Sequence, residues 1–195
     1  MNIKTQNGKR LFITGIPTAG KSYLAEKLAS EVNGIAVLLD DLRKPLKADE
    51  KYKKWVNFYW DQDEETYFTK TDPEQMWKNL VAQSEALWPA FLQKIQEYAA
   101  EKRPVIFECV NMLPHICYRD LDFPGICLIG SSYEQTFERN KKDPHWGKTL
   151  RLQELEAKMF FYVERPRYKS EAEKYGYPVF ETSDDAFETA LKFLK

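Results

Sequence analysis

Gly15-Ile16-Pro17-Thr18-Ala19-Gly20-Lys21-Ser22 matches the pattern G-x-x-x-x-G-K-[S/T] at every fixed position. The two fixed glycines allow backbone conformations that other residues resist, so several amide N–H groups can converge on one anion. Lys21 adds a flexible positive charge for the β- and γ-phosphates, and Ser22 offers a hydroxyl to Mg²⁺. We therefore predict that this loop, together with Tyr23 at the start of the next element, binds the phosphates of ATP.

The elements on either side of the loop support this interpretation. Arg10 to Thr14 reads as a short buried strand, and Lys21 to about Glu31 has the spacing of an amphipathic helix. A glycine-containing turn that binds nothing is the plainer alternative. A strand before the loop and a helix after it are the context that a phosphate-binding loop requires.

Four more apolar runs read as strands: 35–39, 105–107, 126–129 and 178–180. Each is short and continuous, as expected for parallel strands covered on both faces. Helical patterns lie between them, notably 73–87 with a kink or restart at Trp88-Pro89, 131–137, 151–162, 170–174 and 184–194. The chain is therefore predicted to be one three-layer α/β domain over 1–195, with a helical substrate lobe at 42–102.

Carboxylates follow two of the predicted strands. Glu108 closes the run at 105–107, and Asp40-Asp41 closes the run at 35–39. Ligands of open parallel sheets bind at the carboxyl ends of the strands. We expect Glu108 to support the metal with Ser22, and Asp40 to orient or deprotonate a phosphate acceptor. A solvated acid is the alternative for Glu108, and Asp41 is nearly as good a candidate as Asp40.

The C-terminal third supplies arginines and a predicted lid. Polar residues with Pro and Gly follow Arg139, so 139–165 reads as a lid region. We predict that Arg139, with Arg165 or Arg167, closes on the transferred phosphoryl group, because guanidinium groups match phosphate oxygens. A surface ion pair is as good an interpretation for any one of these residues.

Aromatic residues crowd the predicted lobe, and two histidines stand alone in the chain. The lobe aromatics, such as Trp55 and Tyr59, indicate either a small core or the wall of a substrate pocket, and core is the better interpretation for most. Trp146 fits either base stacking or lid packing. His115 and His145 lack metal-like partners, so a structural or solvated role is expected for both.

Composition limits the class of protein. The 195 residues are 43% hydrophobic, enough for one sizeable core, and the net charge of −1 lacks the basic excess of nucleic-acid or membrane-surface binders. The three cysteines have no zinc-site spacing, and their odd number fits free thiols in the cytoplasm. We expect no nucleic-acid or membrane partner.

The chain resembles the nucleotide-kinase-like P-loop kinases, which include adenylate, shikimate and chloramphenicol kinases. The resemblance rests on the Walker A loop at 15–22, acids after the second and third strands, and an arginine-bearing helix and lid after the fourth. Residues 105–114 also resemble 2-phosphoglycerate-kinase-like proteins, with Cys109 where those have Gly. The resemblance implies strand order 2-3-1-4-5, use of ATP and Mg²⁺, and acceptor binding by the insertion. Asp-Gly-x-Pro-Arg, usual after strand three in nucleoside monophosphate kinases, is absent, so a mononucleotide acceptor is not expected.

Two functions follow from these observations. The first is an ATP-dependent phosphotransferase that acts on a small-molecule acceptor, with Lys21, Asp40 and Glu108 in its site. The alternative is a regulatory or switch-type NTPase whose helical insertion binds a protein partner. Substantial ATP hydrolysis without an acceptor would distinguish the second from the first.

Overall fold

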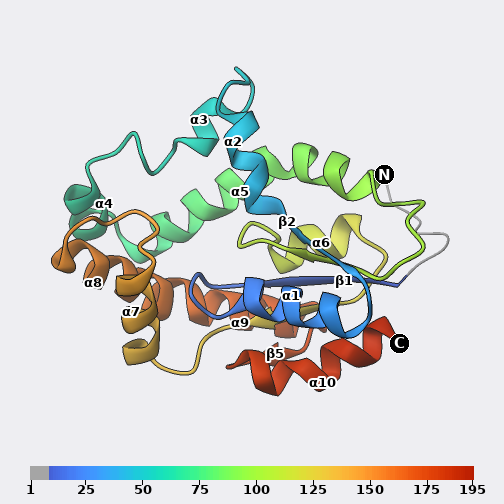
Figure 1. Ribbon diagram of the computed structural model, residues 1–195. Helices are drawn as coiled ribbons and strands as arrows, with labels where there is room; N and C mark the ends of the chain where they lie inside the picture. Colours follow the sequence, from blue (N-terminus) through green and yellow to red (C-terminus); the bar gives the residue numbers. More distant parts are fainter. Residues whose placement is uncertain (1–8) are drawn as a thin grey trace.

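A five-stranded parallel sheet lies at the centre of the structure, a computed structural model that describes residues 9–195 (Figure 1). The strand order is β2-β3-β1-β4-β5, which confirms the predicted topology. The strands are β1 (Arg10–Gly15), β2 (Ile35–Leu38), β3 (Val105–Glu108), β4 (Gly125–Leu128) and β5 (Val179–Phe180).

The middle strand β1 is buried along its whole length, as its continuous apolar run predicted. It pairs with β3 through Ile13 opposite Glu108, and with β4 through Phe12 opposite Gly125. Phe12 explains why position 125 is glycine, since a Cβ there would lie 2.0 Å from the Phe12 ring. Gly125 therefore lets the ring cross β4 and pack against Phe123.

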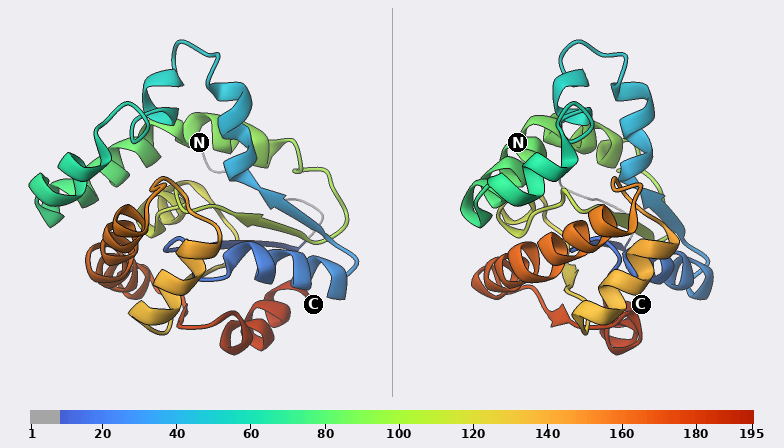
Figure 2. Two further views of the ribbon diagram at one scale, coloured as in Figure 1. Left: turned by 60° about the vertical axis from the view of Figure 1, so that its left-hand side comes forward. Right: turned by 90° about the vertical axis from the view of Figure 1, so that its left-hand side faces the viewer.

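Helices cover both faces of the sheet (Figure 2). On one face α1 (Lys21–Glu31) contacts α10 (Ser183–Leu194), and on the other α6 (Pro114–Asp120) contacts α9 (Arg165–Lys174). This division follows from right-handed crossovers, because α1 leads from β1 back to the edge strand β2, whereas α6 and α9 lead in the opposite direction across the sheet. The sequence patterns did not predict α6, a helix of only seven residues that begins at Pro114.

The helical lobe follows β2. It consists of η1 (Leu39–Leu42), α2 (Arg43–Leu46), α3 (Lys53–Val56), α4 (Glu64–Lys70) and α5 (Pro73–Gln96). Asp72 caps α5, since its side chain accepts a hydrogen bond from Gln75 N at 3.0 Å. The helix does not restart at Trp88-Pro89, because α5 continues through Pro89. Trp88 donates its indole N–H to Asp120 at 2.7 Å and is buried, so tertiary packing offsets the hydrogen bond that proline cannot make.

The region after β4 is more helical than predicted. It contains α7 (Tyr133–Lys142), α8 (Leu150–Lys158), a π-helical turn η2 (Met159–Glu164) and α9, with only 143–149 as a connecting loop between α7 and α8. The expected gap between 162 and 170 is instead η2 running directly into α9. Pro166 lacks an N–H, so a widened turn carries the chain past it without ending the helical run.

Two apolar clusters hold the described part of the chain together. The larger one surrounds the sheet. The smaller one joins the helical lobe to residues 139–165, the segment predicted to be a lid and called the lid below, through buried residues from both, namely Tyr67, Met76, Trp146, Met159 and Phe160. Within residues 9–195, no helix has the length and apolar character needed to cross a membrane.

Candidate nucleotide and acceptor site

The phosphate-binding loop connects β1 to α1 and has three residues in the left-handed region. The φ angles are 125° at Gly15, 63° at Thr18 and 92° at Gly20. A Cβ at Gly15 would lie 1.8 Å from the carbonyl oxygen of Leu128 in β4. Gly15 is therefore required by the backbone conformation and by close packing of β1 on β4, and Gly20 by the conformation that starts α1.

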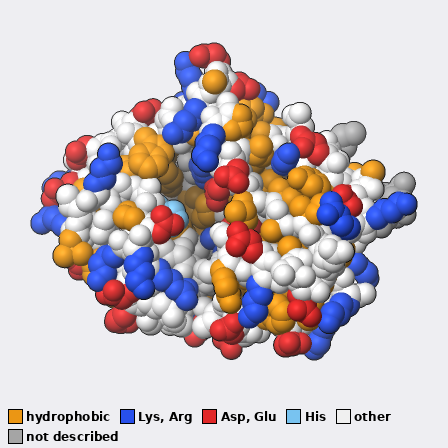
Figure 3. All heavy atoms as spheres, viewed as in Figure 1, with side chains coloured by type: hydrophobic (Ala, Val, Ile, Leu, Met, Phe, Trp, Pro, Cys, Tyr) orange, Lys and Arg blue, Asp and Glu red, His pale blue; other side chains and the backbone are white. Residues whose placement is uncertain are grey.

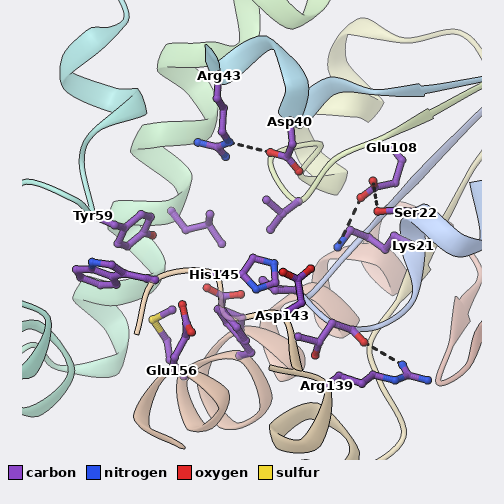
Figure 4. A pocket seen from close by; sticks show the side chains of 18 of the residues that line it. Lys21, Ser22, Asp40, Arg43, Tyr59, Glu108, Arg139, Asp143, His145 and Glu156 are labelled. Atoms are coloured by element: carbon purple, nitrogen blue, oxygen red, sulfur yellow. Dashed lines mark hydrogen bonds and ion pairs between the residues drawn. The ribbon is translucent and has the colours of Figure 1, made fainter. Parts of the chain in front are cut away.

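Lys21, Ser22 and Glu108 converge at the carboxyl ends of β1 and β3 (Figure 4). Lys21 Nζ donates to the carbonyl oxygen of Ile16 at 2.9 Å and lies 3.7 Å from Glu108 Oε1. Ser22 Oγ donates to Glu108 Oε2 at 2.9 Å. Burial raises the pKa of Glu108, an effect that Lys21 opposes.

Asp40 lies beside this group, on the turn η1 that follows β2. Its Oδ1 accepts a hydrogen bond from Arg43 Nε at 2.8 Å and another from the Cys109 thiol at 3.5 Å. Arg43 also donates to the Asn111 side chain. Burial alone would raise the pKa of Asp40, but Arg43 and then Lys21 hold it below the ordinary value, so Asp40 is ionised at neutral pH.

A single pocket of about 530 Å³ joins the loop, the lobe and the lid. The phosphate-binding loop, Asp40 and Glu108 form one end, where Tyr23 also lines the wall. The lobe adds residues such as Tyr59, and the lid adds His145. Figure 3 shows the hollowed face with acidic and basic side chains around it. The volume is typical of small-molecule sites.

The three predicted arginines have different positions. Arg139, in α7, lines the pocket and donates to the carbonyl oxygen of Thr18 at 2.9 Å. Arg165 binds Glu181 at 2.7 Å, and Arg167 binds Glu74 at 2.9 Å. Neither Arg165 nor Arg167 is among the residues that line the pocket. The structure thus brings Arg139 to the phosphate-binding loop and leaves the other two in ion pairs on α9.

Several pocket residues were not singled out as functional from the sequence, among them one histidine and two glutamates. His145 lines the pocket although it was expected to be structural or solvated, and Glu156 and Glu164 are buried acids on the lid helices. No local motif marks these positions. The available signal is that Glu156 interrupts the apolar face of the helix predicted over 151–162, where a charge is costly without a partner; Glu164 lies outside that predicted helix.

Trp146 packs in the lid and does not stand free for a base. It is 6% exposed, and its ring centroid lies 5.4 Å from that of Tyr59 and 5.1 Å from that of Phe68. These contacts close the lid loop over the lobe. Tyr59 and Trp146 both line the pocket while belonging to the smaller apolar cluster, so they are at once core and pocket wall.

The loop end of the pocket fits the magnesium complex of ATP. Mg²⁺ is usually held by one or two protein oxygens, with phosphate oxygens and water completing the shell. Ser22 Oγ and Glu108 Oε2 lie together, and the buried Thr18 Oγ1 has no hydrogen-bond partner within the described residues. No group of three or more acidic, histidine or cysteine side chains that could hold a metal lies within residues 9–195. Mg²⁺ bound to ATP does not require such a group, because one or two protein oxygens, as in the Ser22–Glu108 pair, are enough.

Comparison with known proteins places the fold. No family model matches the chain, and no curated protein is similar to it in sequence. Among solved structures, the chain is similar to a shikimate kinase from Acinetobacter baumannii in complex with shikimate, with a TM-score of 0.52 and 11% identity over 95% of this chain and 92% of that one.

Two further solved structures are similar over nearly their whole length. A gluconokinase from Sinorhizobium meliloti 1021 gives a TM-score of 0.43 and 16% identity over 98% of this chain and 93% of that one. A deoxyadenosine kinase from M. mycoides with bound dATP gives a TM-score of 0.48 and 15% identity over 94% of this chain and 95% of that one. The strand order agrees with the likeness to the shikimate kinase. The fold of this chain is that of the nucleotide-kinase-like P-loop kinases.

Proposed function

We propose that this protein is an ATP-dependent phosphotransferase that acts on the hydroxyl group of a small molecule. The observation that carries the proposal is the shared pocket: Lys21, Ser22 and Glu108 line it together with Asp40 and with lobe and lid residues. A site that only bound a nucleotide would not need an ionised carboxylate and an enclosed space beside the phosphates. The three structural neighbours are small-molecule kinases, which agrees with this reaction class.

The residues would divide the work as follows. Lys21 and the loop amides hold the β- and γ-phosphates, and Arg139 adds positive charge near Thr18. Mg²⁺, held through Ser22 and Glu108, would neutralise charge between the β- and γ-phosphates. Asp40 orients the acceptor hydroxyl in line with the γ-phosphorus.

Bond making and breaking then balance simply. The acceptor oxygen forms a bond to the γ-phosphorus as the bond to the β–γ bridging oxygen breaks, and ADP leaves. The hydroxyl proton passes to Asp40 and from there to solvent. A low pKa suits Asp40 to orient the hydroxyl, because a loose transition state needs little proton abstraction before bond formation.

ATP consumption in the presence of candidate acceptors tests the proposal. We expect little turnover with ATP and Mg²⁺ alone, and turnover with matching phosphorylated product once the acceptor is added. The Lys21→Ala variant should show no acceptor-dependent turnover of ATP. Rapid hydrolysis without any acceptor, not increased by a broad acceptor panel, would contradict a kinase and favour the switch-type NTPase.

We further propose that the protein acts in the cytoplasm. The support is that its three cysteines are free and buried, as in a reducing compartment. The same thiols predict that the protein keeps its activity in reducing buffer. Loss of activity under thiol reductants would contradict this.

A further inference from the structure

A buried acid in the pocket has one carboxyl oxygen without a hydrogen-bond partner among residues 9–195. Glu164, the last residue of η2, is 4% exposed and lines the pocket. Its Oε2 has no hydrogen-bond partner, and within residues 9–195 Glu164 takes part in no ion pair. A buried carboxyl oxygen without a partner costs free energy, so its retention in a pocket points to a ligand that supplies the partner.

Glu156 is a second buried acid nearby, but its role differs. It is 2% exposed, accepts a hydrogen bond from Asn140 Nδ2 at 2.8 Å, and also accepts from the backbone N–H groups of Trp146 and Gly147. Glu156 therefore fixes the lid loop. Its negative charge raises the pKa of Glu164, so a positively charged ligand is needed to stabilise both carboxylates.

The pocket as a whole has more acidic than basic side chains in its lining. Three basic side chains line the pocket, and five acidic ones do. Arg43 is paired with Asp40 at 2.8 Å, and Lys21 lies 3.7 Å from Glu108, so these cations are matched at the phosphate end. Figure 4 places Glu156 on the side of Tyr59, away from Lys21 and Ser22. No unmatched cation is left there for an anionic acceptor.

The walls around the acids are aromatic. Tyr59, Trp146 and Phe160 line the pocket, and the ring centroids of Tyr59 and Trp146 are 5.4 Å apart. Tyr59 is close enough for the charge of Glu164 to act on its phenol. Aromatic faces and a buried carboxylate together are the environment that attracts an organic ammonium group, through ring quadrupoles and an ion pair.

We propose that Glu164 and the aromatic walls form a subsite for a protonated amine, so that the acceptor carries a hydroxyl at the Asp40 end and a basic amino group at the Glu164 end. This rests on the proposed function and names its substrate class as amino alcohols, including amino sugars. The ammonium N–H groups donate to the unpartnered Glu164 Oε2. A neutral polyol or an anionic acceptor would not supply the positive charge that lets the buried Glu164 carboxyl ionise.

Matched pairs of compounds that differ only by an amino group in place of a hydroxyl test the subsite. The probes are glucosamine with glucose, tyramine with tyrosol, and phenylethanolamine with phenylethylene glycol. Calorimetry at neutral pH with the non-hydrolysable ATP analogue present measures their affinities for the full chain. At least one amine should bind about tenfold more tightly than its hydroxyl partner.

Variants separate the subsite from the rest of the site. Glu164→Gln should lower the affinity of that amine about tenfold, leave its hydroxyl partner unaffected and leave the affinity for the ATP analogue unchanged. Glu173→Gln, on the same helix run and paired with Lys169 at the surface, is the control and should behave as wild type. Equal binding within every pair, or amine affinity retained in Glu164→Gln, overturns the proposal.

The two proposals fail in different ways. If amines bind through Glu164 but no ATP is consumed with any of them, the phosphotransferase function is wrong and the amine subsite stands. If an acceptor is phosphorylated but no amine is a better acceptor than its hydroxyl partner, and Glu164→Gln keeps wild-type kcat/KM for the amines, the function stands and the amine subsite is wrong.

Discussion

Ser22 Oγ donates a hydrogen bond of 2.9 Å to Oε2 of Glu108, and so links the first turn of α1 to the end of β3. The two residues are far apart in sequence and meet because β1 and β3 are neighbours in the sheet. The hydroxyl and the carboxylate are oxygen ligands suited to Mg²⁺. Their separation fixes where the metal complex of ATP would sit relative to Lys21.

Glu108→Gln should reduce turnover by about two orders of magnitude or more, because the amide keeps the hydrogen bond from Ser22 but loses the charge that attracts the metal. The measurement is kcat as a function of Mg²⁺ concentration, and saturation should require more metal. Glu97→Gln, an exposed acid paired with Lys94, is the control. An unchanged Mg²⁺ dependence would show that Glu108 does not support the metal.

Asp40→Asn should cut turnover steeply and leave ATP affinity nearly intact, since Asp40 acts on the acceptor and not on the nucleotide. Asp41→Asn is the matched control, because Asp41 is on the same turn but does not line the pocket. Kinetics with ATP varied at saturating acceptor, together with calorimetric ATP binding, separate the two effects. Equal losses in both variants would remove the preference for Asp40.

Arg139→Ala should lower kcat by about a hundredfold, because a cation beside the phosphate-binding loop stabilises charge on the transferred group. Catalytic roles for Arg165 and Arg167 stay predictions, and both residues lie in ion pairs outside the pocket lining. Steady-state kinetics of the alanine variants at Arg139, Arg165 and Arg167 compare the loss of kcat at the three positions. A loss in Arg167→Ala as large as in Arg139→Ala would require a rearrangement of α9 during turnover.

Glu164 should make the folded protein less stable as pH rises. Burial first, and then the charge of Glu156, raise the pKa of Glu164 to about 8 against an opposing effect of Lys21, compared with 4.5 for the ordinary carboxyl. The folded state therefore holds this proton more tightly than the unfolded state does. Its stabilising contribution is complete below about pH 4 and is lost as pH rises through about 8.

Glu164→Gln cannot ionise and escapes this loss. The variant should match wild type in thermal stability at about pH 5 and exceed it at about pH 9, each pKa unit corresponding to about 1.4 kcal/mol. The charge of Glu164 is coupled electrostatically to nearby titratable groups, namely Tyr59, Tyr67, Lys21 and Glu156. Wild type and Glu164→Gln are therefore compared with each other at each pH. A constant difference across the range would refute the raised pKa.

Trp146→Ala should lower the free energy of unfolding by about 3 kcal/mol, as for other buried aromatic residues cut back to alanine. The loop 143–149 should also exchange its amide protons faster, because Trp146 is its buried anchor against Tyr59 and Phe68. Trp60→Ala is the control: Trp60 is 53% exposed, and its loss should change stability by no more than about 0.5 kcal/mol. Equal destabilisation by the two would argue against lid anchoring.

Much of the fold could be predicted because its signals are local. The loop 15–22 carries its own chemistry, and five short apolar runs define parallel strands whose carboxyl ends locate Asp40 and Glu108. The predicted helix boundaries near prolines were less accurate than the predicted strands. Pro89 lies inside α5 and Pro166 inside a continuous helical run, because packing and a π-turn accommodate what local propensity reads as a break.

The sequence by itself therefore determined the phosphate-binding loop, the sheet order implied by the resemblance, and the acids at the strand ends. Only the tertiary structure decided the far end of the pocket. Glu164, Trp146 and Tyr59 belong to segments far apart in the chain, and no spacing relates them. They meet because the apolar faces of lobe and lid bury each other, and that long-range packing sets which carboxyl is left without a partner.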